Sequence, residues 1–268
     1  MSSDLGKITD QQQKMWATGD FHQFGVSLLV VGEMLVRSLH VHAGEAVLDV
    51  AGGAGNAALA AARRWANVLC TDYVPELLQR AKRRAEAEGL PLRTQVANVQ
   101  QLPFGDHTFD VVTSTFGAIF APDQSRTALE LLRVLRGGGR LGMANWTPQS
   151  WISSQFALLA QFRPPPPGLT PPSAWGTETR LRELFGGHIS SLQIRQQYAD
   201  ICHHDTTSLF EFFCEWFGPV ATVWHALAEP QRENFRNDWI ALADEFNIAR
   251  DGTCEIRSEY LEIVAVKA

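Results

Sequence analysis

The chain has 268 residues, of which 45% are hydrophobic and 19% are charged, and its formal net charge is −6. This composition can bury a full core and excludes an intrinsically disordered protein. An acidic balance gives no attraction to a phosphate backbone, so we expect no nucleic-acid substrate. The 4 cysteines form no CxxC pair, which argues against a metal site or a disulfide framework and favours a reducing compartment.

The N-terminal segment contains no apolar run of the kind that a secretion signal has. The most apolar early stretch, residues 24–39, is interrupted by Glu33 and Arg37 and is too short to span a bilayer. We therefore expect a cytoplasmic protein with no membrane partner. Nothing in the sequence predicts its oligomeric state.

Helices and then an alternation of strands and helices are predicted in chain order. Residues 1–44 are expected to be helical, with Thr9 or Asp10 capping a helix that ends at Ala17. A short apolar run over 46–50 predicts a strand that is buried on both faces. Strands that alternate with helices at this spacing are typical of βαβ units and a mostly parallel sheet. The expected strands are 46–50, 67–71, 92–97, 109–114, 140–144, 189–198 and 260–266.

A glycine-rich segment, residues 47–56, joins the first predicted strand to the first predicted helix of this alternation. Glycines let a ligand approach the backbone closely, and a helix N-terminus presents free N–H groups. Asp72 follows Gly53 by about 20 residues, at the end of the second strand, where an acid can hold both ribose hydroxyls. The pattern Gly53-x-Gly55-x-x-Ala58 also satisfies a dinucleotide fingerprint. These residues alone predict an adenosine-containing cofactor and leave its identity open.

Four segments in order resemble the class I S-adenosylmethionine-dependent methyltransferases, of the group that includes ubiquinone and menaquinone biosynthesis enzymes. The family's D-x-G-x-G-x-G is similar to residues 49–55, and its second-strand acid to Asp72. Its D-A-E-x-L-P-F…F-D-V-V is similar to residues 98–112, and its L-K-P-G-G to residues 135–139. Two positions depart from the pattern, because Ala51 replaces the first glycine and Asn98 replaces the acid expected near the adenine.

The resemblance implies a Rossmann-like α/β fold: a seven-stranded, mostly parallel sheet whose last strand is antiparallel, flanked by helices and covered by a helical cap. It divides the chain into an N-terminal helical lid (1–44), a cofactor-binding core (45–148), and cap helices with the last two strands (149–268). It also implies S-adenosylmethionine as cofactor, S-adenosylhomocysteine as product, and methyl transfer to a small molecule. The implied cofactor-binding residues are Asp49, Ala51, Gly52, Gly53, Asp72, Tyr73, Asn98, Val99, Ser114, Thr115 and Phe116.

On the acceptor side, an oxygen nucleophile would benefit from a histidine base, because imidazole has a pKa near neutrality. The candidates are His22, in an N-terminal segment, and His203 and His204, which follow the predicted sixth strand. Methyl transfer is an in-line displacement for which positioning and desolvation can suffice, so a base is not obligatory. The candidate pocket residues are Trp16 and Phe21, expected in the lid, and Trp146 after the fifth strand.

Two alternatives stay open besides the expected enzyme. Ala51 and Asn98 are compatible with a cofactor-binding protein that has lost turnover and acts as a partner or sensor. An NAD-dependent oxidoreductase would account for the glycines and Asp72, but not for the Leu102-Pro103-Phe104 segment or for the last strand. Neither the acceptor molecule nor the accepting atom is predicted, and methylation of a protein also stays open.

Overall fold

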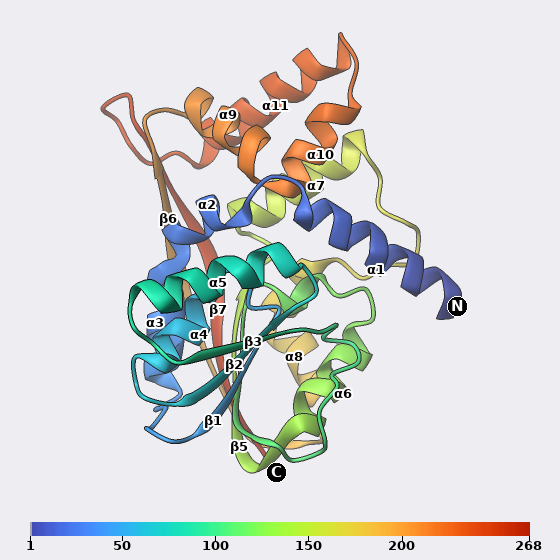
Figure 1. The fold of residues 1–268 in the computed structure, drawn as a ribbon. Coiled ribbons are helices and arrows are strands. Elements are labelled where there is room, and N and C mark those ends of the chain that lie inside the picture. The colour runs from blue at the N-terminus through green and yellow to red at the C-terminus, as the bar shows by residue number, and fades with distance from the viewer. Residues whose placement is uncertain (1) are drawn as a thin grey trace.

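One sheet organises the part of the chain that the structure, a computed structural model, describes, which is residues 2–268. Among these residues, seven strands lie in the order β3-β2-β1-β4-β5-β7-β6 (Figure 1). The strands are β1 (Ala46–Val50), β2 (Asn67–Asp72), β3 (Leu92–Val96), β4 (Phe109–Thr115), β5 (Leu135–Trp146), β6 (Ile189–His203) and β7 (Cys254–Lys267).

The first five strands pair in parallel, and β7 runs antiparallel between β5 and β6. This confirms the predicted fold class. Strand order reverses between β1 and β4. Open α/β sheets bind ligands beyond the carboxyl ends of their strands at such a reversal, so the fold itself marks the place to look for a site.

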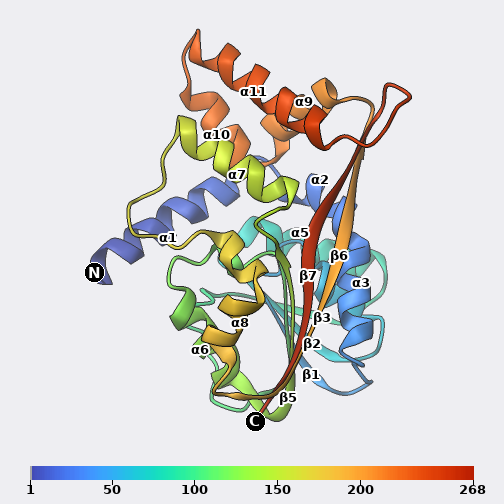
Figure 2. The ribbon, with the colours of Figure 1, turned by 180° about the vertical axis from the view of Figure 1, so that it is seen from behind.

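Helices cover both faces of the sheet. Helices α3, α4 and α5 lie on one face, whereas α6 and α8 lie on the other (Figures 1 and 2). The helices are α1 (Ser2–Ala17), α2 (Phe21–Gly25), α3 (Leu29–Ser38), α4 (Asn56–Ala62), α5 (Pro75–Ala87), α6 (Gln124–Val134), α7 (Trp151–Phe162), α8 (Glu178–Phe185), α9 (Thr206–Trp216), α10 (Gly218–Ala226) and α11 (Gln231–Phe246), with short 3-10 turns η1 (Val26–Leu28), η2 (Ala118–Phe120) and η3 (Pro172–Gly176).

A layer of helices stands beyond the carboxyl ends of the parallel strands. Strands β6 and β7 extend past the rest of the sheet (Figure 2). Helices α9, α10 and α11 connect the end of β6 to the start of β7. Helix α7 packs on α11 and α10, and α1 packs on α10. Segments from both ends of the sequence therefore meet above the reversal point. None of the helices within residues 2–268 combines the length and apolar character needed to cross a membrane.

Two local expectations were wrong. Helix α1 begins at Ser2, and the Thr9 hydroxyl donates to the Leu5 carbonyl oxygen inside the helix instead of capping its start. A threonine in a helix interior can form this bond to the preceding turn, so it gave a false start signal. Strand β6 runs to His203, which pairs with Cys254 of β7, so this histidine belongs to the strand and does not follow it.

Candidate active site

The glycine-rich segment forms a tight turn between β1 and α4. The Gly52 N–H donates to the Thr71 carbonyl oxygen at 2.9 Å, which holds the turn against β2. A methyl group on Gly52 would lie 2.5 Å from Asp49 Oδ2, so no larger residue fits there. Ala51 has φ +47, in the left-handed region where glycine is favoured. The departure from the family pattern at this position therefore leaves a strained alanine in the same turn.

Asp49 supports this turn from beneath. Its side chain is fully buried; Oδ1 accepts from Thr113 Oγ1 at 2.8 Å and Oδ2 from the Ala58 N–H at 3.1 Å. Burial raises the pKa of this carboxyl to about 7, and the two hydrogen bonds oppose that rise. Asp49 thus connects β1, β4 and the first turn of α4, but it does not line the cavity above them.

Asp72 lies at the end of β2 and faces the cavity. Its Oδ2 accepts from the Gly53 N–H and its Oδ1 from the Val74 N–H, each at 2.9 Å. Burial raises the pKa of Asp72 to about 6. None of the ion pairs formed within residues 2–268 involves this carboxylate. Each oxygen retains a free lone pair, so the group can accept two further hydrogen bonds from a ligand.

Two adjoining cavities open beside this turn, at the reversal of strand order. The larger has about 840 Å³ of space between protein atoms, part of it open to solvent, and the smaller about 340 Å³. They share the residues Ala51, Tyr73, Gly117 and Phe120. Of the expected cofactor residues, the larger is lined by Ala51, Gly52, Gly53, Asp72, Tyr73, Thr115 and Phe116, and the smaller by Ala51, Tyr73, Asn98 and Val99.

The end of β4 closes one side of the larger cavity. Ser114 is buried beneath it, and its Oγ accepts from the Ala118 N–H at 3.0 Å, so this residue shapes the turn without lining the cavity. Phe116 has φ +62, and its ring stacks on Trp146 with centroids 3.8 Å apart. A methyl group on Gly117 would lie 2.1 Å from the Ala51 carbonyl oxygen. The two turns therefore touch backbone to backbone, and only glycine allows this contact.

Aromatic residues from distant segments also line the larger cavity. The Trp16 ring of α1 packs 4.9 Å from Phe120 and 5.6 Å from Phe21, and Phe217 lies 5.7 Å from Trp16. The three expected pocket residues, Trp16, Phe21 and Trp146, thus all line one cavity. Residues that the sequence interpretation did not assign to the cavity include Phe24, Gly25, Leu28, Ala54, Asn56, Leu77, Gly117, Phe120, Ile152, Phe156 and Phe217.

The three candidate histidines lie elsewhere. Within residues 2–268, neither cavity lining includes His22, His203 or His204. Burial is the largest influence on His22 and on His203, and it lowers the pKa of both. The His203 and His204 rings stand 5.5 Å apart at the far end of β6. The same described residues contain no group of three or more His, Cys, Asp or Glu side chains placed to hold a metal ion.

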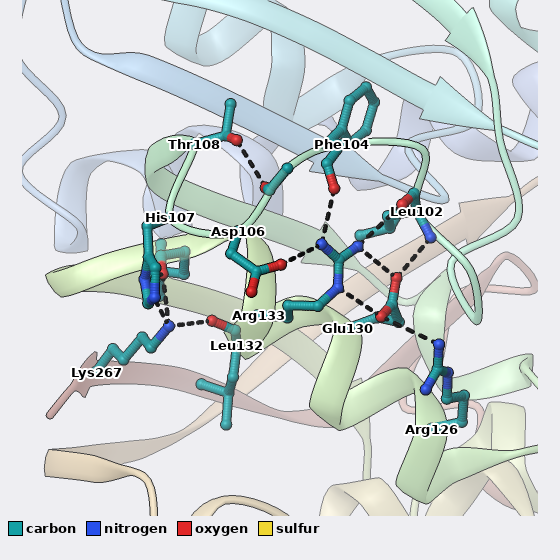
Figure 3. Close-up of polar contacts among 12 residues, drawn as sticks. Leu102, Phe104, Asp106, His107, Thr108, Arg126, Glu130, Leu132, Arg133 and Lys267 are labelled. Atoms are coloured by element: carbon teal, nitrogen blue, oxygen red, sulfur yellow. Dashed lines mark hydrogen bonds and ion pairs between the residues drawn. The ribbon is translucent and has the colours of Figure 1, made fainter.

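An ion pair between the buried Glu130 and the half-buried Arg133 fixes the loop that leads from the smaller cavity to β4 (Figure 3). The Glu130 carboxylate accepts from the Leu102 N–H at 2.7 Å and from Arg133 Nε at 2.7 Å. Arg133 also donates to the carbonyl oxygens of Leu102 and Phe104, at 2.9 Å and 2.7 Å. These contacts bind the Leu102-Pro103-Phe104 segment to α6.

The comparisons agree with this architecture. Residues 48–143 match the sequence profile of a family described as a methyltransferase domain. The chain is 39% identical over 209 residues to the uncharacterized protein Rv1405c of Mycobacterium tuberculosis, covering 77% of this chain and 76% of that one. It is 38% identical over 124 residues to the demethylmenaquinone methyltransferase of Thermus thermophilus, 46% of this chain and 49% of that one. The YcgJ protein of Bacillus subtilis has the same fold, with a TM-score of 0.61 at 19% identity over 88% of this chain and 97% of that one.

The chain therefore belongs to the class I S-adenosylmethionine-dependent methyltransferases, and its cofactor is S-adenosylmethionine. The residues of the site fit this molecule. The glycine turn brings the backbone of Ala51, Gly52 and Gly53 to the wall of the cavity, and the adjacent Asp72 carboxylate forms no ion pair within residues 2–268 and offers acceptors to a ligand.

Proposed function

We propose that this chain transfers a methyl group to an apolar small molecule that binds in the aromatic half of the larger cavity. One observation carries the proposal: the glycine turn and Asp72 line the same cavity as Trp16, Phe156 and Phe217. A cofactor held beside the glycine turn and Asp72 would face an acceptor held beside these aromatic rings. Rings and aliphatic side chains bury apolar surface well and offer few partners to a charged molecule, which favours an aromatic or isoprenoid-like acceptor.

We further propose how the chain holds its cofactor, following the family resemblance. Ala51, Gly52 and Gly53 border the methionine part, and Asp49 keeps their turn in place. Asp72 accepts from the ribose hydroxyls. The remaining expected residues divide between the adenine, beside Tyr73, Asn98 and Val99, and the amino-acid end, near Ser114, Thr115 and Phe116. The bound cofactor supplies an electrophilic methyl group on a sulfonium.

Rate acceleration is proposed to come from positioning and from exclusion of water. Within the described residues, Asp72 and Tyr73 are the titratable side chains that line the larger cavity, and Asp72 is assigned to the ribose. The surrounding aromatic wall would desolvate a nucleophile and hold it in line with the methyl group. A histidine base stays a prediction without geometric support, so single alanine variants of His22, His203 and His204 are expected to keep turnover.

The predicted division of the chain is retained as part of this proposal. Residues 1–44 act as a lid, 45–148 as the cofactor-binding core, and 149–268 as the cap with the last two strands. Its support is the placement of α1, whose Trp16 lines the larger cavity and whose Gln13 side chain donates to the Tyr73 carbonyl oxygen. The lid therefore contacts the core beside the expected cofactor site.

Calorimetric titration with S-adenosylhomocysteine tests the cofactor part. Because the pKa of Asp72 is about 6, its carboxylate form increases as the pH rises from 5 to 7. Affinity should rise about tenfold over this interval and then level off, since the charged form accepts hydroxyl donors more strongly. Asp72→Asn should bind about 100-fold more weakly and lose this pH dependence. Asp205→Asn, which alters a helix N-cap outside both cavities, should behave as the unaltered chain.

A turnover assay tests the acceptor part. The chain is incubated with S-adenosylmethionine and either phenols and quinols that carry an apolar tail or their short, charged counterparts. We expect methylation only of the first set. Cofactor binding without methylation of either set would favour the alternative of a protein that has lost turnover.

A further inference from the structure

The smaller cavity is lined by both polar and apolar side chains. It adjoins the larger cavity at Ala51 and Tyr73, beyond the Asp72 carboxylate, and apolar side chains of Val99, Phe120 and others line it. A ribose held at Asp72 would place the base of the cofactor in this cavity. Its side-chain carboxamides come from Asn98, Gln100 and Gln12.

The carboxamide oxygen of Asn98 has no acceptor capacity left. It accepts from the Gln100 backbone N–H at 2.9 Å and from Gln100 Nε2 at 3.2 Å, which uses both of its lone pairs. A backbone N–H can only donate, so the oxygen and nitrogen of this carboxamide are assigned without ambiguity. Within residues 2–268, the Asn98 NH2 group donates to no protein atom. The side chain therefore offers only a donor to a ligand.

Gln100 is itself held from two further sides, so this arrangement is rigid. Its Oε1 accepts from the Asp123 N–H at the start of α6, at 2.9 Å. Its Nε2 donates to Thr9 Oγ1 of α1 at 3.1 Å, and Arg126 Nε donates to its carbonyl oxygen at 3.1 Å. If the Asn98 carboxamide were rotated by 180°, its NH2 group would face the Gln100 donors. If the Gln100 carboxamide were rotated, its Nε2 would face the Asp123 N–H. Gln100 therefore acts as a positioning residue for Asn98.

We propose that Asn98, positioned by Gln100, makes this base site a hydrogen-bond donor, so that the exocyclic amino group of adenine contributes nothing to cofactor affinity. The amino group of adenine is a donor and would face another donor at Asn98, whereas the ring nitrogens are acceptors that the Asn98 NH2 group can satisfy. An aspartate at position 98 would reverse this preference, because a carboxylate only accepts. The inference rests on the proposed function.

Binding measurements with S-adenosylhomocysteine and its deamino analogue, in which purine replaces adenine, test the proposal at pH 8. The unaltered chain should bind the two compounds within threefold of each other. Asn98→Asp, which preserves shape and both acceptor contacts to Gln100, should prefer S-adenosylhomocysteine by about tenfold, because one hydrogen bond to the amino group is then gained. Gln12→Ala tests the carboxamide that lines the same cavity from α1 and should bind the two compounds within threefold of each other. Asp205→Asn, outside both cavities, is the control.

The outcomes distinguish failure of the inference about Asn98 from failure of the proposed function. A tenfold preference of the unaltered chain for S-adenosylhomocysteine overturns the inference, and loss of that preference in Gln12→Ala would assign recognition of the amino group to Gln12 instead. No preference in Asn98→Asp also overturns it, because Asn98 then does not face the amino group. Failure of the unaltered chain to bind either compound overturns the proposed function and this inference with it.

Discussion

The two walls of the larger cavity are built in different ways. The polar wall consists of two short turns after β1 and β4 whose backbones touch, with Ala51 and Phe116 both at positive φ. The aromatic wall consists of side chains from α1, α2, α7 and the residue after α9, which meet only when the chain has folded. The first wall depends on backbone geometry within a few residues, whereas the second depends on packing between distant helices.

Because of this difference, the two walls should respond differently to substitution. A turn held backbone to backbone has no side chain that can move aside, so one added methyl group should disturb both the fold and cofactor binding. In a wall of packed rings, a half-buried member such as Trp16 or Phe156 can be lost while its neighbours stay in place. Substitutions in the polar wall should therefore affect stability and cofactor together, and those in the aromatic wall should affect the acceptor alone.

The largest effect is expected for Gly117→Ala. The backbone of Gly117 is in the right-handed helical region, which alanine adopts without strain. The added methyl group, however, would lie 2.1 Å from the Ala51 carbonyl oxygen. The free energy of unfolding should fall by about 3 kcal/mol, and S-adenosylhomocysteine should bind at least about tenfold more weakly. Denaturant unfolding and calorimetry measure the two effects.

Gly105→Ala is the matched control, because its methyl group would meet only Thr108 Oγ1, at 3.7 Å. Its unfolding free energy should change by less than about 0.5 kcal/mol. If Gly117→Ala were as stable as this control, the backbone contact between the two turns would not be a constraint.

A smaller effect, restricted to the acceptor, is expected for Phe156→Ala. Phe156 lies on α7, lines the larger cavity and packs 5.1 Å from Phe120. Its loss removes apolar contact area from the acceptor, so kcat/KM for an apolar acceptor should fall about tenfold. Affinity for S-adenosylhomocysteine should stay within twofold of the unaltered value.

Phe162→Ala on the same helix is the control, since Phe162 packs on Phe235 away from both cavities. It should lower stability without changing kcat/KM for the acceptor. Equal kinetic losses in the two variants would show that α7 acts through its overall position and that Phe156 is not a contact residue.

The sequence predicted the polar wall better than the aromatic one. The glycine segment and Asp72 are close in sequence to strand ends, so their meeting follows from parallel strands whose carboxyl ends share one edge. Phe156 and Phe217 are separated by η3, by helices α8 and α9 and by β6. Helical spacing alone does not distinguish a ring that lines a cavity from one in the core. The spacing of Phe21, Phe24 and Leu28 was the available signal for the missed lid residues, because it places them on one helical face.

The departure at Asn98 shows a further limit of the sequence. From the residue alone, its carboxamide could accept from an adenine amino group or donate to the base. The choice depends on Gln100, two residues away, whose two N–H groups occupy the oxygen. The contact from the backbone N–H is an Asx turn, which an asparagine forms locally. The contact from Gln100 Nε2 was not predictable, because α6 and α1 hold the Gln100 side chain in place.

The smallest expected effect concerns the other departure, Ala51. Its left-handed backbone costs an alanine about 1–2 kcal/mol, and glycine would remove this cost while losing about 0.5–1 kcal/mol to unfolded-state entropy. Ala51→Gly should therefore raise the free energy of unfolding by up to about 1 kcal/mol and the Tm by about 2 °C. In the Gly117→Ala background, Ala51→Gly should stabilise no more than it does in the unaltered chain, because the carbonyl oxygen of residue 51, at 2.1 Å, is a closer contact than its methyl group, at 2.7 Å. A larger gain in the double variant would instead mean that the alanine methyl sets the spacing of the two turns, and that this departure from the family pattern reshapes the cofactor site.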